Sequence, residues 1–95
     1  MITLEITPNS IRMSGHAGRK SPDGIDRPCA AVSALTCNLI NSLRDLSGDQ
    51  IRADTGSGMT EIIWQELSEK GKLLVDSWFL GLTDINQEYN CITFL

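Results

Sequence analysis

The sequence has few basic residues, few aromatic residues and no long apolar run. Eight Lys and Arg residues stand against twelve Asp and Glu residues, which gives a formal net charge of −4 at pH 7. Nucleic-acid binding is therefore not expected as the main function, because it usually requires a basic surface. A run of about 18 apolar residues is absent, so we expect no membrane-spanning helix. Residues 1–10 also lack the basic start and apolar stretch of a signal peptide, which predicts a cytoplasmic protein.

Cysteine is scarce as well. The chain has only Cys29, Cys37 and Cys91, and an odd number of cysteines cannot all pair within the chain. In a reducing compartment we expect free thiols. Three cysteines and one histidine can form a zinc site, but no two cysteines have the close spacing of about two to four residues that zinc ligands show. We therefore expect no metal and no cofactor, with Cys37 in or near the core and Cys91 in a strand.

The length of 95 residues predicts one domain, residues 1–95, and the apolar fraction of 41% is enough for one modest core. A chain this short buries a smaller fraction of its surface than a long chain does, so a homodimer would be a natural source of additional stability. We expect Trp64 and Trp78 either in the core or in a dimer interface.

Hydrophobic periodicity divides the chain into strands and helices. Alternating β-branched and apolar residues predict strands at 2–7, 11–16, 50–55, 59–65 and 90–95. Apolar residues at steps of three and four predict a helix from Cys29 to a stop at Gly48, and a second helix over about 66–87. The order ββαββαβ predicts an α+β fold, with two helices packed on a largely antiparallel sheet.

Each predicted helix has an apolar stripe that should face the sheet. The stripe of the first helix consists of Val32, Leu35, Leu39, Leu43 and Leu46. The stripe of the second helix consists of Leu67, Leu74, Trp78, Leu82 and Ile85, and it is widened by Leu73 and Leu80.

The only histidine and one of the cysteines stand at the two ends of a predicted loop. His16 ends a predicted strand, and Cys29 begins a predicted helix thirteen residues later. A helix N-terminus carries partial positive charge and free N–H groups, which stabilise a thiolate. A neighbouring imidazole can accept the thiol proton, so the pair indicates nucleophilic catalysis. The alternative is that Cys29 is a small buried apolar residue and His16 an ordinary surface side chain.

Two further groups belong to this hypothesis. Asp26 lies three residues before Cys29, the spacing at which an N-cap carboxylate accepts a backbone N–H. Asp26 could instead orient the imidazole of His16, as an acid does in a catalytic triad, although the spacing favours the cap. Asp23 is a second candidate for the orienting acid. The backbone N–H groups of Cys29 and Ala30 are the expected oxyanion donors of an acyl-transfer reaction.

Several short segments together resemble one known family. The segments Gly15–Gly18 (GHAG), Gly24–Asp26 (GID) and Cys29–Leu35 (CAAVSAL) resemble those of the ribosomal-processing cysteine proteases, the Prp family. The stretch from Leu80 to Tyr89 is also similar to the C-terminal part of that family. The resemblance extends through nearly the whole chain.

The resemblance implies a small bacterial α+β homodimer that removes a short N-terminal extension from a large-subunit ribosomal protein. Cys29 would be the nucleophile, and His16 would be the general base and acid. The loop between them would cover the site and become ordered when the substrate binds. The residues that would contact the peptide are Gly18, Arg19, Lys20, Gly24 and Arg27.

The loop departs from the usual pattern of the family. It is one residue longer, and it carries Arg27-Pro28 where two apolar β-branched residues are usual. Because the loop should contact the peptide, these differences bear on which substrate is cut.

A function of a different class fits the same sequence. The chain could keep the fold and the dimer without catalysis, as a binding module for a ribosomal or other basic partner, which its acidic surface would attract. Thiol reactivity separates the two, because only the enzyme needs a reactive thiolate at Cys29.

Overall fold

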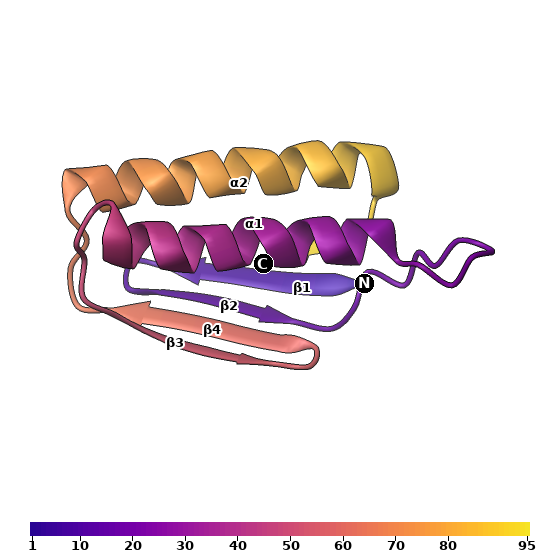
Figure 1. Ribbon diagram of the computed structural model, residues 1–95, viewed down its shortest axis with the longest axis horizontal. Helices are drawn as coiled ribbons and strands as arrows, with labels where there is room; N and C mark the ends of the chain where they lie inside the picture. Colours follow the sequence, from indigo (N-terminus) through magenta and orange to yellow (C-terminus); the bar gives the residue numbers. More distant parts are fainter.

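The computed structural model describes residues 1–95 as one sheet covered by two helices (Figure 1). The elements are β1 (Ile2–Thr7), β2 (Ser10–Ser14), α1 (Arg27–Asp45), β3 (Ile51–Gly56), β4 (Met59–Trp64), α2 (Glu69–Tyr89) and β5 (Ile92–Phe94). The order ββαββαβ and the α+β class predicted from the sequence are confirmed. Two boundaries differ near the predicted loop, because β2 ends at Ser14 instead of His16 and α1 begins two residues before Cys29.

The strands form one sheet in the order β3-β4-β2-β1-β5. All neighbours are antiparallel except β1 and β5, which run parallel with Ile2 opposite Ile92. Both helices lie on one face of this sheet (Figure 1). The opposite face carries polar pairs such as Arg12 and Glu61, which are register partners on β2 and β4 and form an ion pair of 2.5 Å. Neither helix is long and apolar enough to cross a membrane.

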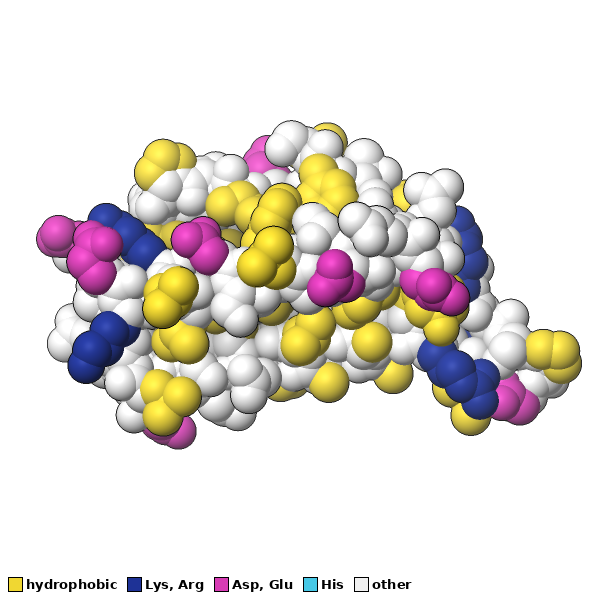
Figure 2. All heavy atoms as spheres, turned by 90° about the horizontal axis from the view of Figure 1, so that it is seen from above, with side chains coloured by type: hydrophobic (Ala, Val, Ile, Leu, Met, Phe, Trp, Pro, Cys, Tyr) yellow, Lys and Arg dark blue, Asp and Glu magenta, His cyan; other side chains and the backbone are white.

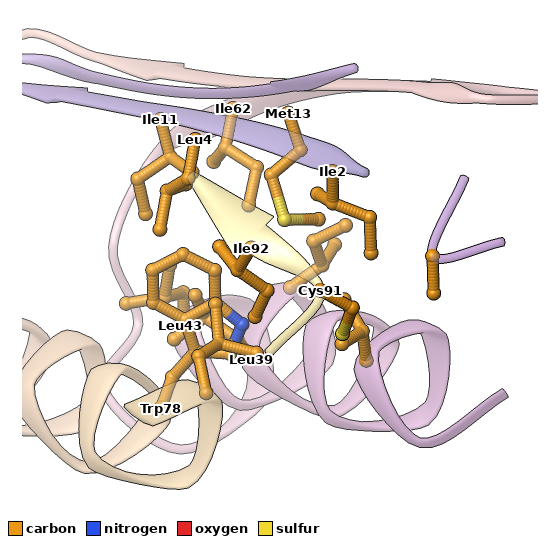
Figure 3. Packing of buried hydrophobic residues seen from close by; sticks show 14 of the residues in the cluster. Ile2, Leu4, Ile11, Met13, Leu39, Leu43, Ile62, Trp78, Cys91 and Ile92 are labelled. Atoms are coloured by element: carbon orange, nitrogen blue, oxygen red, sulfur yellow. The ribbon is translucent and has the colours of Figure 1, made fainter. Parts of the chain in front are cut away.

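The core lies between the sheet and the helices (Figure 3). Alternate side chains of the strands point toward the helices because successive residues of a strand face opposite sides. The buried residues labelled in Figure 3 are Ile2, Leu4, Ile11, Met13, Leu39, Leu43, Ile62, Trp78, Cys91 and Ile92. The Trp78 indole donates to Thr36 Oγ1 at 3.1 Å, and that hydroxyl donates to a carbonyl of the preceding helical turn. The polar atoms brought into this core are therefore satisfied.

Four residues expected in or near the core are exposed instead. Leu46, Leu73 and Leu80 are 72%, 69% and 65% exposed, and Cys37 is also exposed. Leu46 lies beyond the last residue of α1, at the C-cap. Leu80 is two residues from the buried Trp78, about 200° around the helix, so the two side chains cannot face the same layer. The periodicity of apolar residues predicts where the apolar stripe of a helix lies. How many residues of that stripe are buried depends on the elements that pack against the helix.

Asp49 joins the segment after α1 to the start of α2. Its carboxylate accepts hydrogen bonds from Ser47 Oγ at 2.6 Å, Ser68 N at 2.8 Å and Ser68 Oγ at 2.9 Å. Ser68 is the N-cap of α2, and its hydroxyl accepts from Gly71 N. The hydrogen bond from Ser47 is the main cause that keeps the pKa of Asp49 below its usual value, against the effect of desolvation.

Replacing Asp49 by Ala should lower the free energy of unfolding by about 1–2 kcal/mol at pH 7, because three hydrogen bonds to a carboxylate are lost. The pKa of Asp49 is lower in the folded state than in the unfolded state. The contribution is therefore complete above the unfolded pKa of about 4 and disappears as the pH falls through the folded pKa. Urea unfolding at several pH values measures both effects. Asp84→Ala on the exposed face of α2 is the control, and an equal loss in both variants would contradict the assignment.

Candidate active site

Three segments meet at one end of the molecule: the end of β2, the beginning of α1 and the tip of the β3–β4 hairpin (Figure 1). His16 follows β2 by two residues, and Cys29 lies in the first turn of α1. His16 and Cys29 line the same cavity, whose volume is about 260 Å³. Apolar residues from the sheet and α1 form part of its lining, and hairpin residues 56–60 form another part. The structure therefore places the two residues of the predicted pair on one shared surface.

The three thiols differ in their surroundings. Cys29 is half-buried at the cavity, Cys37 is exposed on α1, and Cys91 is fully buried immediately before β5. Burial raises the pKa of the Cys91 thiol, which keeps it protonated at neutral pH. Cys29 is thus the partly exposed thiol that lines the same cavity as the histidine. Groups of three or more His, Cys, Asp or Glu side chains arranged to hold a metal ion are absent.

The carboxylate of Asp26 is the N-cap of α1. Its Oδ1 accepts from Cys29 N at 3.1 Å, and its Oδ2 accepts from Arg19 N at 3.1 Å. Desolvation alone would raise the pKa of Asp26, but these backbone hydrogen bonds outweigh it and the pKa lies below its usual value. Of the two roles considered for Asp26, the geometry is that of the cap, since both oxygens bind backbone N–H groups and neither binds the His16 ring.

The same cap changes the expected oxyanion site. The N–H of Cys29 donates to the Asp26 side chain, and the N–H of Ala30 donates to the Asp26 carbonyl at 3.1 Å. The expectation that these two groups are free oxyanion donors is therefore wrong for this structure. The physical reason differs for the two groups. The N–H of Cys29 has no partner within the helix and is bound by the cap, whereas the N–H of Ala30 makes the first backbone hydrogen bond of the helix.

Asp23 is part of the loop's own hydrogen-bond network. Its carboxylate pairs with the Arg27 guanidinium at 2.8 Å and accepts from Ile25 N and from the Ser21 hydroxyl. These contacts, above all the one with Arg27, lower the pKa of Asp23 to about 2. Asp23 therefore does not orient His16. Arg27, an expected substrate contact, is paired within the loop, and Ile25 is exposed there.

Arg19 connects the loop to the end of α2. Its guanidinium donates to Tyr89 O at 3.2 Å and to Asn90 O at 2.8 Å. Carbonyl groups at a helix C-terminus lack partners within the helix, and a cation is favourable near them. The Arg19 side chain thus anchors the loop, although it was expected to contact a peptide.

Two of the expected loop residues do lie at the site. Gly18 and Lys20 line a second, open cavity together with His16, Asp26 and Cys29. Gly24 lies in the turn between Ser21 and Ile25, and it lines neither of the two cavities.

The β3–β4 hairpin tip was not expected at the site. Gly56, Ser57 and Gly58 line the cavity, and the sequence indicates them only as a turn. The strand order places β4 beside β2, so the tip of this hairpin lies next to the end of β2. A sequence-based prediction of that strand order would have been needed to include the tip.

Comparison with known proteins identifies the family of the chain and finds solved structures with the same fold. The model of the family "Cysteine protease Prp" matches residues 1–92. The chain is similar to the structure of the ribosomal processing protease Prp from S. aureus with a covalently linked product peptide, with 25% identity, a TM-score of 0.88, and coverage of 99% of this chain and 97% of that one. The same protease with a substrate peptide gives 24% identity, a TM-score of 0.85, and coverage of 100% and 98%. SMU.848 from Streptococcus mutans gives 29% identity, a TM-score of 0.72, and coverage of 98% and 89%. No curated protein matches the sequence.

Replacing Arg19 by Ala should lower the stability by about 1 kcal/mol, or about 4–8 °C in Tm for a chain of this size, because two carbonyl groups at the end of α2 lose their charged donor. Arg19→Lys should recover only part of the loss, since an ammonium group cannot reproduce the planar fork of the guanidinium. Thermal unfolding followed by circular dichroism measures both variants. Arg52→Ala on β3 is the matched control, and a Tm of Arg19→Ala within a degree of that control would refute the anchoring role.

Proposed function

The chain belongs to the Prp family of cysteine proteases, and we propose that it removes a short N-terminal extension from a bacterial large-subunit ribosomal protein. The family match confirms the resemblance stated from the sequence and makes the chain a cysteine protease, so the non-catalytic binding module is set aside. The observation that carries the proposal is that His16 and Cys29, the chain's single histidine and its half-buried thiol, line the same cavity. Residues 1–95 would act as one protease domain in the cytoplasm.

The reaction proceeds through a covalent intermediate on Cys29. His16 accepts the thiol proton, and the thiolate attacks the carbonyl carbon of the scissile peptide bond. When the tetrahedral intermediate collapses, His16 gives the proton to the leaving amine and a thioester remains. Water, deprotonated by His16, then attacks the thioester and releases the free thiol and a carboxylate. The positive end of the α1 dipole favours the thiolate throughout, because Cys29 lies in the first turn.

The cavity suits an extended peptide. Ile2, Met13 and Val32 give it an apolar part that can accept an apolar side chain of the substrate. Gly18 and Lys20 border the second, open cavity, which His16 and Cys29 also line, and the peptide would meet the loop there. The S. aureus Prp structures contain a substrate peptide in one case and a covalently linked product peptide in the other, which supports a peptide substrate here.

A homodimer is part of the proposal, formed through the helical layer. Leu73 and Leu80 are exposed on α2, and Leu46 is exposed at the end of α1. Figure 2, which shows the molecule from the helical side, has several apolar side chains gathered over this layer. Association of two such faces would remove this apolar surface from water.

Replacing Cys29 by Ala should reduce cleavage at least about 1000-fold, because no other group can form the thioester. His16→Gln should reduce it about 100-fold or more through loss of the general base. The assay uses a synthetic peptide that spans the extension and the first mature residues of the host's ribosomal protein, with products identified by mass spectrometry. Cys37→Ala is the matched control and should keep its activity within about twofold, since Cys37 lies away from the cavity. Unchanged cleavage by Cys29→Ala would eliminate the nucleophile assignment.

Alkylation provides a second test that needs no substrate. Iodoacetamide at pH 6–7 should modify Cys29 faster than the exposed Cys37, because a thiolate is the reactive species, and Cys91 should stay unmodified in the folded chain. Peptide mapping gives the three rates separately. Equal rates at Cys29 and Cys37, together with peptide binding but no cleavage, would restore the binding-module hypothesis.

Replacing Leu80 by Glu should convert the dimer to a monomer at micromolar concentration, since a charge would be buried at the helical interface. Sedimentation velocity measures the change. Ile6→Glu, at an exposed apolar position on β1, is the control and should remain dimeric. A parent chain that sediments as a monomer at the same concentration would exclude this interface.

A further inference from the structure

A glycine at the tip of the β3–β4 hairpin lies directly against the imidazole of His16. A Cβ added at Gly58 would lie 2.8 Å from Nε2 and 3.3 Å from Cε1 of this ring. Ordinary van der Waals contacts of a Cβ begin at about 3.4 Å, so any side chain at position 58 would require the ring to move. Gly58 also has φ of +71°, a conformation that glycine adopts without strain.

The hairpin tip is also bonded to the backbone that carries His16. Gly15 N donates to Gly58 O at 2.9 Å, one residue before the histidine. This bond continues the β2–β4 ladder, in which Ser14 is the partner of Met59. Gly58 therefore lies at a fixed position relative to the His16 backbone, and the imidazole occupies the space that a side chain at position 58 would need.

The ring has no orienting acid of the kind that a triad supplies. Asp26 uses one oxygen for Cys29 N and the other for Arg19 N, and Asp23 is paired with Arg27. His16 is exposed, so packing on the other sides of the ring is sparse. An imidazole that acts on a thiol needs a defined orientation, and a third group usually provides it by a hydrogen bond. In this structure the group packed against the His16 ring is Gly58, at the tip of the β3–β4 hairpin.

We propose that Gly58 is a positioning residue: by having no side chain, it sets the rotamer of His16 beside Cys29 in the cavity that all three line. The inference rests on the proposed function of His16 as the general base. It concerns how the ring is held, and it assigns to the hairpin tip the orienting role that an acid has in a catalytic triad.

The test compares Gly58→Ala with Gly48→Ala. Gly48 has φ of +68° and no atom within 4 Å of an added Cβ, so Gly48→Ala introduces nearly the same backbone strain without contact to the site. Relative to this control, Gly58→Ala should lower kcat/KM for the extension peptide about 10- to 100-fold, mainly through kcat, and should change the pH profile. Activity within twofold of the control, or a loss confined to KM with an unchanged pH profile, would overturn the proposal.

A second measurement is independent of turnover. His16 is the only histidine, so its ring gives one set of imidazole signals in a ¹H–¹³C NMR spectrum of the folded chain. Gly58→Ala should shift the Hε1 and Hδ2 signals at pH 7, whereas Gly48→Ala should leave them in place. Shifted signals in a chain that cleaves no peptide would reject the proposed protease function but support the contact. Unshifted signals in Gly58→Ala would reject the positioning role even if the chain is an active protease.

Discussion

One carboxylate, that of Asp26, determines where the site begins. One of its oxygens holds the N–H of Cys29 and the other holds the N–H of Arg19. The first bond starts α1 and therefore fixes the thiol at the positive end of the helix dipole. The second bond brings the beginning of the loop to the same point, so the chain returns to α1 soon after it leaves His16. Cys29, helix α1 and the loop thus share a single capping group.

The rest of the molecule supplies a rigid frame for this group. His16 lies just beyond β2 of the sheet, and Cys29 lies in α1. Arg19 connects the loop between them to the C-terminal end of α2. Asp49 fixes the opposite end of the helical layer through Ser68. A site formed by short segments at the ends of packed elements keeps its geometry better than one formed by a free loop. The part that stands away from the frame is the segment of the loop around Asp23, which is held by its own ion pair with Arg27.

Local patterns in the sequence were sufficient for the helices and strands, and they placed His16 and Cys29 at the two ends of one loop. Asp26 and Pro28 mark a helix start, and the alternation in residues 2–7 marks a strand, because these effects act over a few residues. The partners of Arg19 lie about seventy residues away in the sequence, so no local pattern could indicate them. The oxyanion expectation was wrong for another reason. The sequence offered two uses for the same amides, and only the geometry decides between them.

The exposed apolar residues also show the difference between what a local pattern predicts and what distant parts of the chain decide. Leu73 and Leu80 belong to the apolar stripe by composition, but their angle around α2 places them outside the layer that the sheet and α1 cover. Gly58 was recognised as a turn residue, yet its position beside His16 depends on β4 pairing with β2 across about fifty residues of sequence. The type of a side chain is thus known from the sequence, whereas the residues that it contacts depend on how the strands and helices are arranged.

The parallel pairing of β1 with β5 has a consequence for the order of assembly during translation. Ile2 pairs with Ile92, and the carbonyl groups that bind Arg19 belong to Tyr89 and Asn90. A nascent chain carries His16 and Cys29 from early in its synthesis, but it cannot form these contacts until residue 92 has left the ribosomal exit tunnel. Contacts between such distant segments form late in folding. The pairing of β5 and the anchoring of Arg19 should therefore be completed later in synthesis than the pairing of β1 with β2.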